Sequence, residues 1–267
     1  MKNLITTFCF LFLFLSAFSQ EMVYQETKDI TYTAHSDGYS QEKCKIDIYY
    51  PENKKDFITL IWFHGGGLTG GSKEIPDYLK NKGIAIVGVG YRFSPQVKVV
   101  DIIGDAADAV KWTFEHIAEY GGSPRKIVVG GHSAGAYLSL MLGLNKRYLS
   151  DRNISTDMIL GIASFSSQAI THFTARKEKG LTEFQPTVDE LAPLFWVRKD
   201  APAILLITGD RELEMVGRYE ENAYLKRMLE LVGHTNVKLF ELDGYDHGMT
   251  YPAYPLLLKE LENWTKK

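Results

Sequence analysis

The stretch that most constrains the fold of this chain is Lys126–Asn145, KIVVGGHSAGAYLSLMLGLN. It begins with the apolar, β-branched run Ile127–Val129, which has the length of a buried strand rather than of a helix. It ends with apolar residues at helical spacing, namely Leu138, Met141 and Leu142. A strand that passes so quickly into a helix predicts a sharp turn at Gly131–Gly135, which has the form G-x-S-x-G. Glycines flank the central serine because a Cβ in so tight a turn would clash.

Ser133 is the residue that such a turn presents. The turn lifts its hydroxyl above the edge of the sheet, and the following helix places N–H donors and a positive dipole end beside it. That arrangement suits a nucleophile whose reaction develops negative charge. The alternative is a glycine-rich turn whose serine only caps the helix. The rest of the chain decides between them.

Further apolar runs and helical patterns alternate along the chain. Short strands are predicted at Leu60–Phe63, Ile84–Val89, Ile127–Val129, Ile159–Ala163, Ile204–Ile207 and Val237–Leu242, with an antiparallel edge from Val23–Tyr32 and Lys43–Tyr50. Helices are predicted at Lys73–Lys82, Asp101–Glu119, Gly217–Val232 and Tyr254–Thr265. The alternation predicts an α/β fold with a mostly parallel central sheet flanked by helices. Functional residues should then follow strands directly, at the carboxyl edge of the sheet.

His64-Gly65-Gly66-Gly67 follows the first of these buried strands. Successive glycines let a backbone approach a substrate closely and point its N–H groups at one spot, as an oxyanion hole requires. A phosphate-binding loop is excluded because Ser72-Lys73 stand in the wrong order, and no dinucleotide-binding glycine pattern opens a helix here. A purely structural turn remains the alternative.

Asp210 and His247 also come after predicted strands. The chain order Ser133, Asp210, His247 is the order expected when a nucleophile elbow supplies the serine of a catalytic triad. Each has a plainer interpretation, Asp210 as a turn residue and His247 as a loop histidine. A neutral histidine base predicts activity that rises with pH.

Neighbouring residues offer alternatives for both roles. Glu212 and Asp246 are the competing acids, although Asp246 adjoins the histidine and is badly placed to reach back to its Nδ1. His132 and His64 are the competing bases. His132 is next to the serine, but an elbow turns successive side chains in different directions. His64 is better explained as a support that braces the glycine loop through a backbone hydrogen bond.

Together these motifs resemble the α/β-hydrolase fold, and within it the HGGG-loop esterase/lipase group. The resemblance is closest to the small secreted carbohydrate esterases that remove acetyl or feruloyl groups. It extends from about Lys45 to the C-terminus and rests on His64–Gly67, Tyr91-Arg92, Asp105, Gly131–Gly135, Gly209-Asp210 and Asp246–Gly248.

The resemblance implies a role for each matching residue. Ser133 would be the nucleophile, His247 the base and Asp210 the acid that orients it. The backbone N–H groups of Gly65, Gly66 and Ala134 would form the oxyanion hole. Two departures stand out: Leu68–Gly71 lacks an aromatic residue that relatives often carry, and Ala136 replaces a common second glycine. Neither removes a catalytic group.

The sequence indicates the substrate class only in outline. We expect a serine carboxylic-ester hydrolase that acts through an acyl-enzyme on short-chain or aryl acyl esters, small or linked to a polysaccharide. A predicted lid, residues 168–199, carries the aromatic side chains of His172, Phe173, Phe184, Phe195 and Trp196. They would stack on a sugar or an aryl ring, or simply pack the lid onto the sheet. An amide or formamide hydrolase, a serine peptidase, a thioesterase and a non-catalytic binding module remain alternatives.

Composition narrows the partners further. A net charge of −3 and the lack of basic runs argue against nucleic acid as a main partner. No cysteine–histidine cluster has metal-ligand spacing, so neither a metal nor another cofactor is expected. Cys44 alternates with Ile46 and Ile48 along one face of a strand, which favours a buried structural thiol. The oligomeric state is left open.

The N-terminus has the pattern of a secretory signal peptide. Lys2 is followed by an apolar core and then by small residues, with Ala17 and Ser19 at the −3 and −1 positions of a cleavage site. The apolar run is shorter than the ~20 residues that span a bilayer, which favours cleavage near Ser19 over a retained anchor. We therefore expect a signal peptide at 1–19, one hydrolase domain at 20–267, and a secreted or periplasmic protein without stable membrane insertion.

Overall fold

The computed structural model describes residues 21–266, so the predicted signal peptide lies outside the described residues. Within this range eight strands form one sheet in the order β1-β2-β4-β3-β5-β6-β7-β8. The strands are β1 (Tyr24–Thr31), β2 (Lys45–Pro51), β3 (Phe57–Phe63), β4 (Ala85–Val89), β5 (Gly122–His132), β6 (Ile159–Phe165), β7 (Ala203–Gly209) and β8 (Val237–Leu242). Only the pairs β1–β2 and β2–β4 are antiparallel. The α/β-hydrolase fold, with its antiparallel edge, is thus confirmed.

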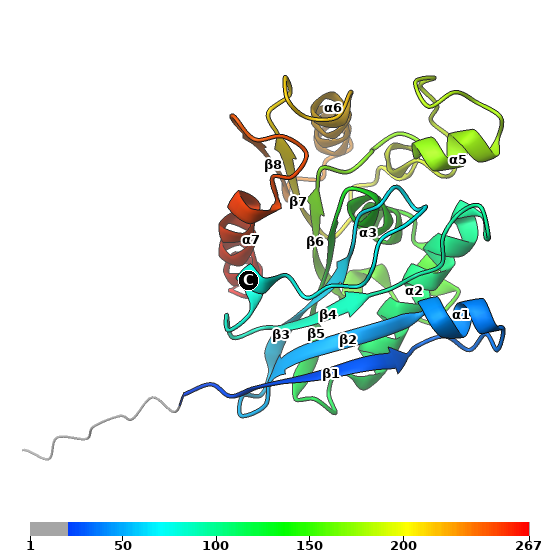
Figure 1. Ribbon diagram of the computed structural model, residues 1–267. Helices are drawn as coiled ribbons and strands as arrows, with labels where there is room; N and C mark the ends of the chain where they lie inside the picture. Colours follow the sequence, from blue (N-terminus) through cyan, green and yellow to red (C-terminus); the bar gives the residue numbers. More distant parts are fainter. Residues whose placement is uncertain (1–20, 267) are drawn as a thin grey trace, which may run out of the picture.

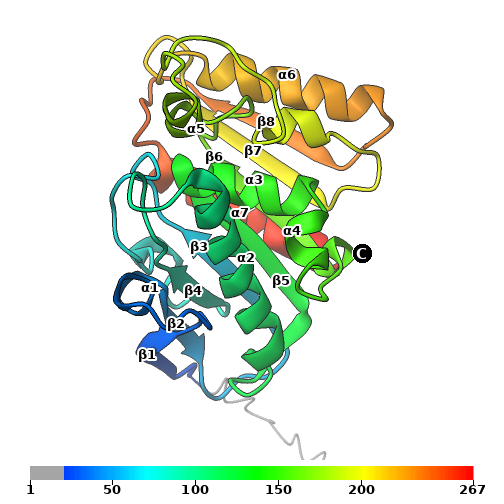
Figure 2. The same cartoon turned by 90° about the vertical axis from the view of Figure 1, so that its right-hand side faces the viewer.

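Helices cover both faces of this sheet. They are α1 (Gly38–Lys43), α2 (Val99–His116), α3 (Ala134–Leu144), α4 (Arg147–Ser150), α5 (Phe173–Glu178), α6 (Arg218–Leu231) and α7 (Thr250–Thr265), with short 3₁₀ turns η1 (Asp77–Leu79), η2 (Thr156–Met158) and η3 (Pro193–Trp196). Figure 1 shows the sheet between these layers. In Figure 2, α2 and α3 lie in front of the sheet and α7 passes behind it.

Alternating side chains of the buried strands fill the two cores. In β3 and β5, Ile61 and Val129 pack beneath α2 and α3, whereas Trp62 and Val128 belong to the cluster beneath α7. Every second residue of a strand points to the same face, so wholly apolar strands are needed where both faces are covered. This accounts for the uninterrupted apolar runs in the sequence.

The predicted helix at Lys73–Lys82 is wrong. Only the 3₁₀ turn η1 forms there. The carbonyl oxygen of Glu74 lies so close to β4 that a Cβ added at Gly88 would be 2.3 Å from it. The Glu74 side chain accepts a hydrogen bond of 2.9 Å from Trp62 Nε1. The segment is therefore held against the sheet by tertiary contacts that its apolar spacing does not reveal.

Cys44 is fully buried with Ile46 and Ile48, as predicted, although it ends α1 and stands just before β2. Burial raises the pKa of its thiol to about 12. A thiol is nucleophilic as the thiolate, so Cys44 is a structural residue. No helix among residues 21–266 is both long and apolar enough to cross a bilayer.

Candidate active site

The turn between β5 and α3 is as sharp as the sequence predicts. Ser133 has φ 54° and ψ −117°, a left-handed backbone that is rare for a residue other than glycine. A Cβ at Gly131 would lie 2.5 Å from the Phe63 carbonyl oxygen, and one at Gly135 would lie 2.0 Å from the same atom. Both flanking glycines are therefore required by the packing of the turn against β3. Such strain at a non-glycine residue is a frequent mark of a functional site.

The glycine loop after β3 lies directly against this turn. A Cβ built on Gly65 would be 3.4 Å from the Cβ of Ser133. Gly66 has φ 114°, and a Cβ there would lie 2.1 Å from the carbonyl oxygen of Gly70. Among the described residues, no backbone or side-chain acceptor takes a hydrogen bond from the N–H of Gly65 or Gly66. Both amides thus remain available beside the serine, while Ala134 opens α3 on its other side.

His64 supports this loop in the predicted way. Its Nδ1 donates a 2.6 Å hydrogen bond to the carbonyl of Gly65, and its ring stacks on Tyr91. The Tyr91 hydroxyl donates to the His64 carbonyl at 2.7 Å. Burial lowers the pKa of His64 to about 4, so the ring is neutral near neutral pH. Next to Tyr91, Arg92 makes a bidentate pair with the buried carboxylate of Asp105, which anchors the same segment on α2.

His247 reaches the elbow from the loop after β8. Its backbone carbonyl accepts a 2.8 Å hydrogen bond from His132 Nε2, and the two imidazole rings are 4.7 Å apart at their centres. His132 is thus engaged in holding the loop. Burial, followed by the repulsion of His247, lowers the pKa of His132 to about 4. About a quarter of the His247 side chain is accessible (27%).

The carboxylate that pairs with His247 is that of Glu214. Its Oε1 lies 2.6 Å from His247 Nδ1, and its side chain is 1% exposed. Ser166 Oγ is 2.8 Å from the same Nδ1 and donates at 2.7 Å to the other carboxylate oxygen. Met215 N and Gly209 N donate to the carboxylate as well. An Nδ1–H that donates to Glu214 leaves Nε2 of His247 as the free acceptor.

The hydrogen bonds to Glu214 keep it ionised. Burial by itself would raise its pKa, but the hydrogen bonds from His247, Met215 and Ser166 outweigh burial and lower the pKa to about 2. A buried carboxylate that accepts four donors stabilises a protonated imidazole without taking its proton. This is the part that the acid of a serine triad plays.

The predicted pairing of Asp210 with His247 is wrong. The Asp210 carboxylate accepts hydrogen bonds from Glu212 N at 3.0 Å and from Gly244 N at 2.9 Å. It therefore ties the β7 loop to the β8 loop. An aspartate directly after a strand turns onto its own loop, as aspartates often do in turns. Glu214 begins farther along the loop and returns to the sheet edge with a longer side chain.

The competing acids named from the sequence make no contact with the His247 ring. Asp246 accepts a hydrogen bond from Gly248 N at 2.8 Å, within its own turn. Glu212 is exposed. Sequence reasoning missed Glu214 because three acids stand in one short loop, and nothing in their spacing indicates which of them is buried.

The predicted lid segment connects β6 to β7 and lies over the glycine loop. Thr174 in α5 donates its hydroxyl to the carbonyl of Gly67, and a Cβ at Gly67 would be 2.9 Å from the Phe173 ring. Of its aromatic residues, His172 is fully buried against Tyr137 and Phe173, whereas Phe184 is 73% exposed. Packing of the lid therefore accounts for His172, whereas the role of the exposed Phe184 in stacking on a substrate stays a prediction.

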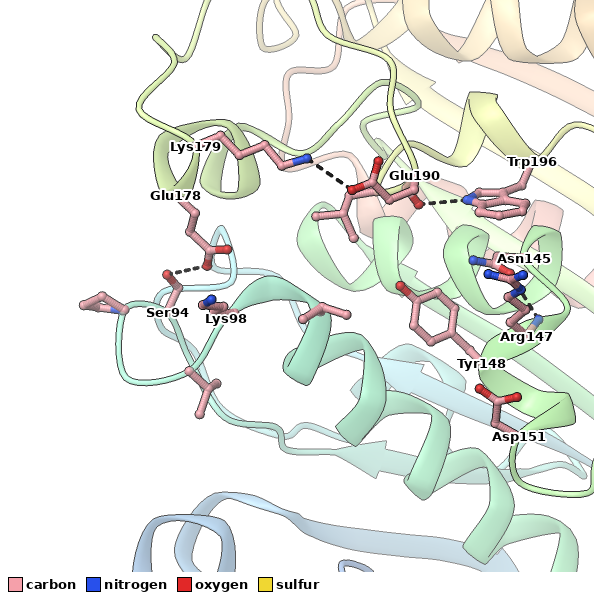
Figure 3. Close-up of a pocket in the computed structure, with 14 residues that line it drawn as sticks. Ser94, Lys98, Asn145, Arg147, Tyr148, Asp151, Glu178, Lys179, Glu190 and Trp196 are labelled. Atoms are coloured by element: carbon pink, nitrogen blue, oxygen red, sulfur yellow. Dashed lines mark hydrogen bonds and ion pairs between the residues drawn. The ribbon is translucent and has the colours of Figure 1, made fainter.

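Two cavities of about 650 Å³ adjoin the lid. The first, drawn in Figure 3, lies between the start of α2, α4 and the lid, and its lining includes Tyr148 and Trp196. Some of its polar groups form hydrogen bonds with one another: Glu178 accepts from Ser94, and Glu190 accepts from both Lys179 and Trp196. None of the predicted site residues lines it.

The second cavity lies between the lid and the loop that carries Glu214. It is lined by Phe173, whose ring adjoins the glycine loop, and by Met215, the residue after Glu214. Its walls are mostly apolar, with Ile170 and Tyr224 among them. A large apolar cavity beside convergent polar groups is the usual form of a ligand site.

A strained serine after a central strand, a glycine loop with available amides and a buried His–Glu pair define a protein of the α/β-hydrolase class. The family model described as BD-FAE matches residues 46–228, which is more than half of the chain. The chain therefore belongs to the BD-FAE family.

Relatives and solved structures agree with this assignment. Esterase LipC of Mycobacterium tuberculosis is 27% identical over 214 residues, which cover 71% of this chain and 52% of LipC. A probable isoprenylcysteine alpha-carbonyl methylesterase of Arabidopsis thaliana, ICMEL1, is 31% identical over 137 residues, or 49% of this chain and 28% of that protein. The chain thus spans between about a quarter and about half of the length of these curated relatives.

The structure described as a truncated form of carbohydrate esterase from gut microbiota is similar to nearly the whole chain. The TM-score is 0.75 at 17% sequence identity, over 93% of this chain and 99% of that one. At this identity the likeness establishes the fold alone.

Proposed function

We propose that this chain is a serine carboxylic-ester hydrolase that acts on short-chain or aryl acyl esters. The observation that carries the proposal is the His247–Glu214 pair beside a strained Ser133 and a glycine loop with two available amides. Ser133 Oγ attacks the ester carbonyl while His247 Nε2 takes its proton, and Glu214 stabilises the resulting imidazolium. The N–H groups of Gly65, Gly66 and Ala134 bind the oxyanion.

His247 next gives the proton that it took from Ser133 to the leaving group, which completes acylation, and later returns a proton to Ser133, which restores the free enzyme. Imidazolium His247 protonates the leaving alkoxide, which departs as the alcohol. Water, deprotonated by His247, then attacks the acyl-enzyme, and Ser133 leaves with the proton as the acid is released. The pKa values of neighbouring groups support this assignment, because Glu214 is ionised beside His247 while burial lowers the pKa of His64 and of His132 to about 4.

The esterase relatives favour esters over amides as substrates. The likeness to a carbohydrate esterase supports a substrate whose acyl groups are esterified to a polysaccharide. The signal-like N-terminus supports export of the enzyme. Segment 168–199 is the lid in this proposal.

The proposal predicts hydrolysis of p-nitrophenyl acetate and butyrate by the purified protein, with kcat/KM falling toward the octanoate. The reason is that the proposed substrates carry short acyl groups, and each methylene added to an acyl group changes its binding by about 1–3 kcal/mol. Release of p-nitrophenol measures the rates. If none of the three esters is turned over, the ester-hydrolase assignment fails and anilides and thioesters become the substrates to test.

The oxyanion loop makes a separate prediction. Gly66→Ala should lower kcat by about 10²–10³-fold, or about 2.7–4 kcal/mol, because its Cβ would strike Gly70 and displace the loop amides. Gly70→Ala is the matched control, since a Cβ there meets nothing within 4 Å. Rates with p-nitrophenyl acetate and thermal melts of both variants test it. Equal activity of the two variants would mean that the position of this loop does not matter to the reaction.

A further inference from the structure

The cavity beside Glu214 contains two buried positive charges. Arg176 and Arg218 both line it and are 3% and 2% exposed. Among the described residues, neither guanidinium has a carboxylate oxygen within 4.0 Å, although such pairs are common elsewhere in the chain. Arg176 Nε and Arg218 Nη1 are buried without any hydrogen-bond partner among these residues. Unpaired charges in so dry a place are costly to keep.

The contacts that Arg176 and Arg218 do make orient the two guanidiniums but do not neutralise their charges. Arg176 Nη1 donates to the carbonyl of Gln185 at 2.7 Å. Arg218 has only a 4.0 Å contact from Nη2 to the sulfur of Met215. Burial lowers the pKa of Arg218; the charges of Glu221 and Glu214 oppose this effect in part, and the charge of Arg176 adds to it. A protein that needed only packing at these positions would be more stable with apolar side chains.

The carboxylates around the cavity are bonded to other groups or exposed, and none pairs directly with the two arginines. Glu221 lines it, and its Oε2 accepts hydrogen bonds from the backbone N–H groups of Ala169 and Ile170. Glu183 pairs with Lys177 at 2.8 Å, and Glu220 is exposed at the rim. Glu214 is engaged by His247. None of these carboxylates lies within 4.0 Å of either guanidinium among the described residues, so both arginines keep hydrogen-bond donors without a protein partner, which a carboxylate ligand would satisfy.

From this arrangement we propose that the cavity binds a carboxylate carried on an apolar, ring-sized body, so that the enzyme prefers ester substrates that bear a free carboxylate. The guanidinium fork matches a carboxylate in shape and hydrogen-bonding pattern, and the apolar walls accept the rest of the molecule. Ser133, His247 and the loop glycines do not line the cavity, but Phe173, which lies against Gly67, and Met215, which follows Glu214, do. A ligand held there would lie on the lid side of the proposed site. This inference rests on the proposed function and names its substrate class.

The test measures binding, so that it is independent of turnover. Ser133→Ala protein is titrated by calorimetry with 3-phenylpropionate and with its neutral isostere 3-phenylpropionamide. We expect the acid to bind at least about tenfold more tightly, since one charge-assisted pair in a buried site contributes that much. In the wild type, the acid should also inhibit p-nitrophenyl acetate hydrolysis competitively. Equal affinity for acid and amide, or no binding of the acid, overturns the proposal.

Variants locate the effect. Arg176→Gln in the same background should abolish most of the preference for the acid while leaving the affinity for the amide unchanged. Arg218→Lys keeps the charge and should keep the preference. Arg147 lines the other cavity, so Arg147→Gln is the control and should leave the affinities for the acid and the amide unchanged. An undiminished preference in Arg176→Gln overturns the proposal. If the protein prefers the acid but hydrolyses no ester, the anion site is supported and the proposed esterase function is contradicted.

Discussion

Ser133→Ala is expected to lower kcat toward p-nitrophenyl acetate by about six orders of magnitude. Loss of the nucleophile of a serine triad abolishes acyl-enzyme formation, and what is left comes from the oxyanion site and substrate binding. Alanine is as compatible with φ 54° as serine, and the hydrogen bond from Ser133 N to the Phe165 carbonyl does not involve the side chain. The fold should therefore survive the change.

Two measurements check this prediction. Burst and steady-state release of p-nitrophenol compare the variant with the wild type, and a thermal melt shows that the variant is folded. Mass spectrometry after treatment with a phosphonate ester should find one covalent adduct in the wild type and none in the variant. A variant that keeps a tenth or more of the rate would show that another group is the nucleophile.

Much of this fold could be predicted from the sequence because its strands are buried on both faces. The runs Leu60–Phe63 and Ile204–Ile207 have no polar residues to interrupt them, and each lies inside an observed strand. The elbow was equally predictable, because only glycine fits against the Phe63 carbonyl at positions 131 and 135. Local physics and global fold agree at these positions.

Where tertiary contacts decide the structure, the sequence was less informative. Segment Lys73–Lys82 has apolar residues at helical spacing. It lies against β4 instead, because Glu74 accepts a hydrogen bond from Trp62 and its carbonyl packs against Gly88. The burial of Arg176 and Arg218 likewise has no signal in the sequence, since arginines in polar stretches are ordinarily exposed.

The acid of the candidate triad illustrates the same limit at the site. Asp210 satisfies every sequence criterion: it follows a strand, has the right chemistry and stands in the right order. What excludes it is the direction of its side chain, which turns toward Glu212 N and Gly244 N. Ser166, which bridges Glu214 and His247, was also missed. Its φ of 53° turns the chain directly after β6, and nothing in the sequence distinguishes it from the neighbouring Ser164 and Ser167.

Glu214→Gln and Asp210→Asn should therefore have very different effects. Glutamine keeps the shape of Glu214 but removes the charge that stabilises imidazolium His247, and its NH₂ group disfavours the Nδ1–H tautomer. Such a change in a serine triad costs about 10⁴-fold in kcat. In Asp210→Asn the new amide side chain still offers an oxygen to the N–H groups of Glu212 and Gly244, so activity should stay within a few-fold of the wild type.

Measuring kcat of both variants on p-nitrophenyl butyrate, with thermal melts beside them, separates the two acids. A large loss in Glu214→Gln with an unchanged Asp210→Asn assigns the role to the glutamate. The opposite result would restore the aspartate named from the sequence, and would mean that the loop after β7 rearranges when substrate binds. The two carboxylates differ in their surroundings as well as their distance from His247: Glu214 is enclosed by four hydrogen-bond donors, whereas Asp210 is partly exposed between two loops. Only a carboxylate shielded from water interacts strongly enough with an imidazolium to change a rate by four orders of magnitude, which is why we expect the glutamate to be the one that matters.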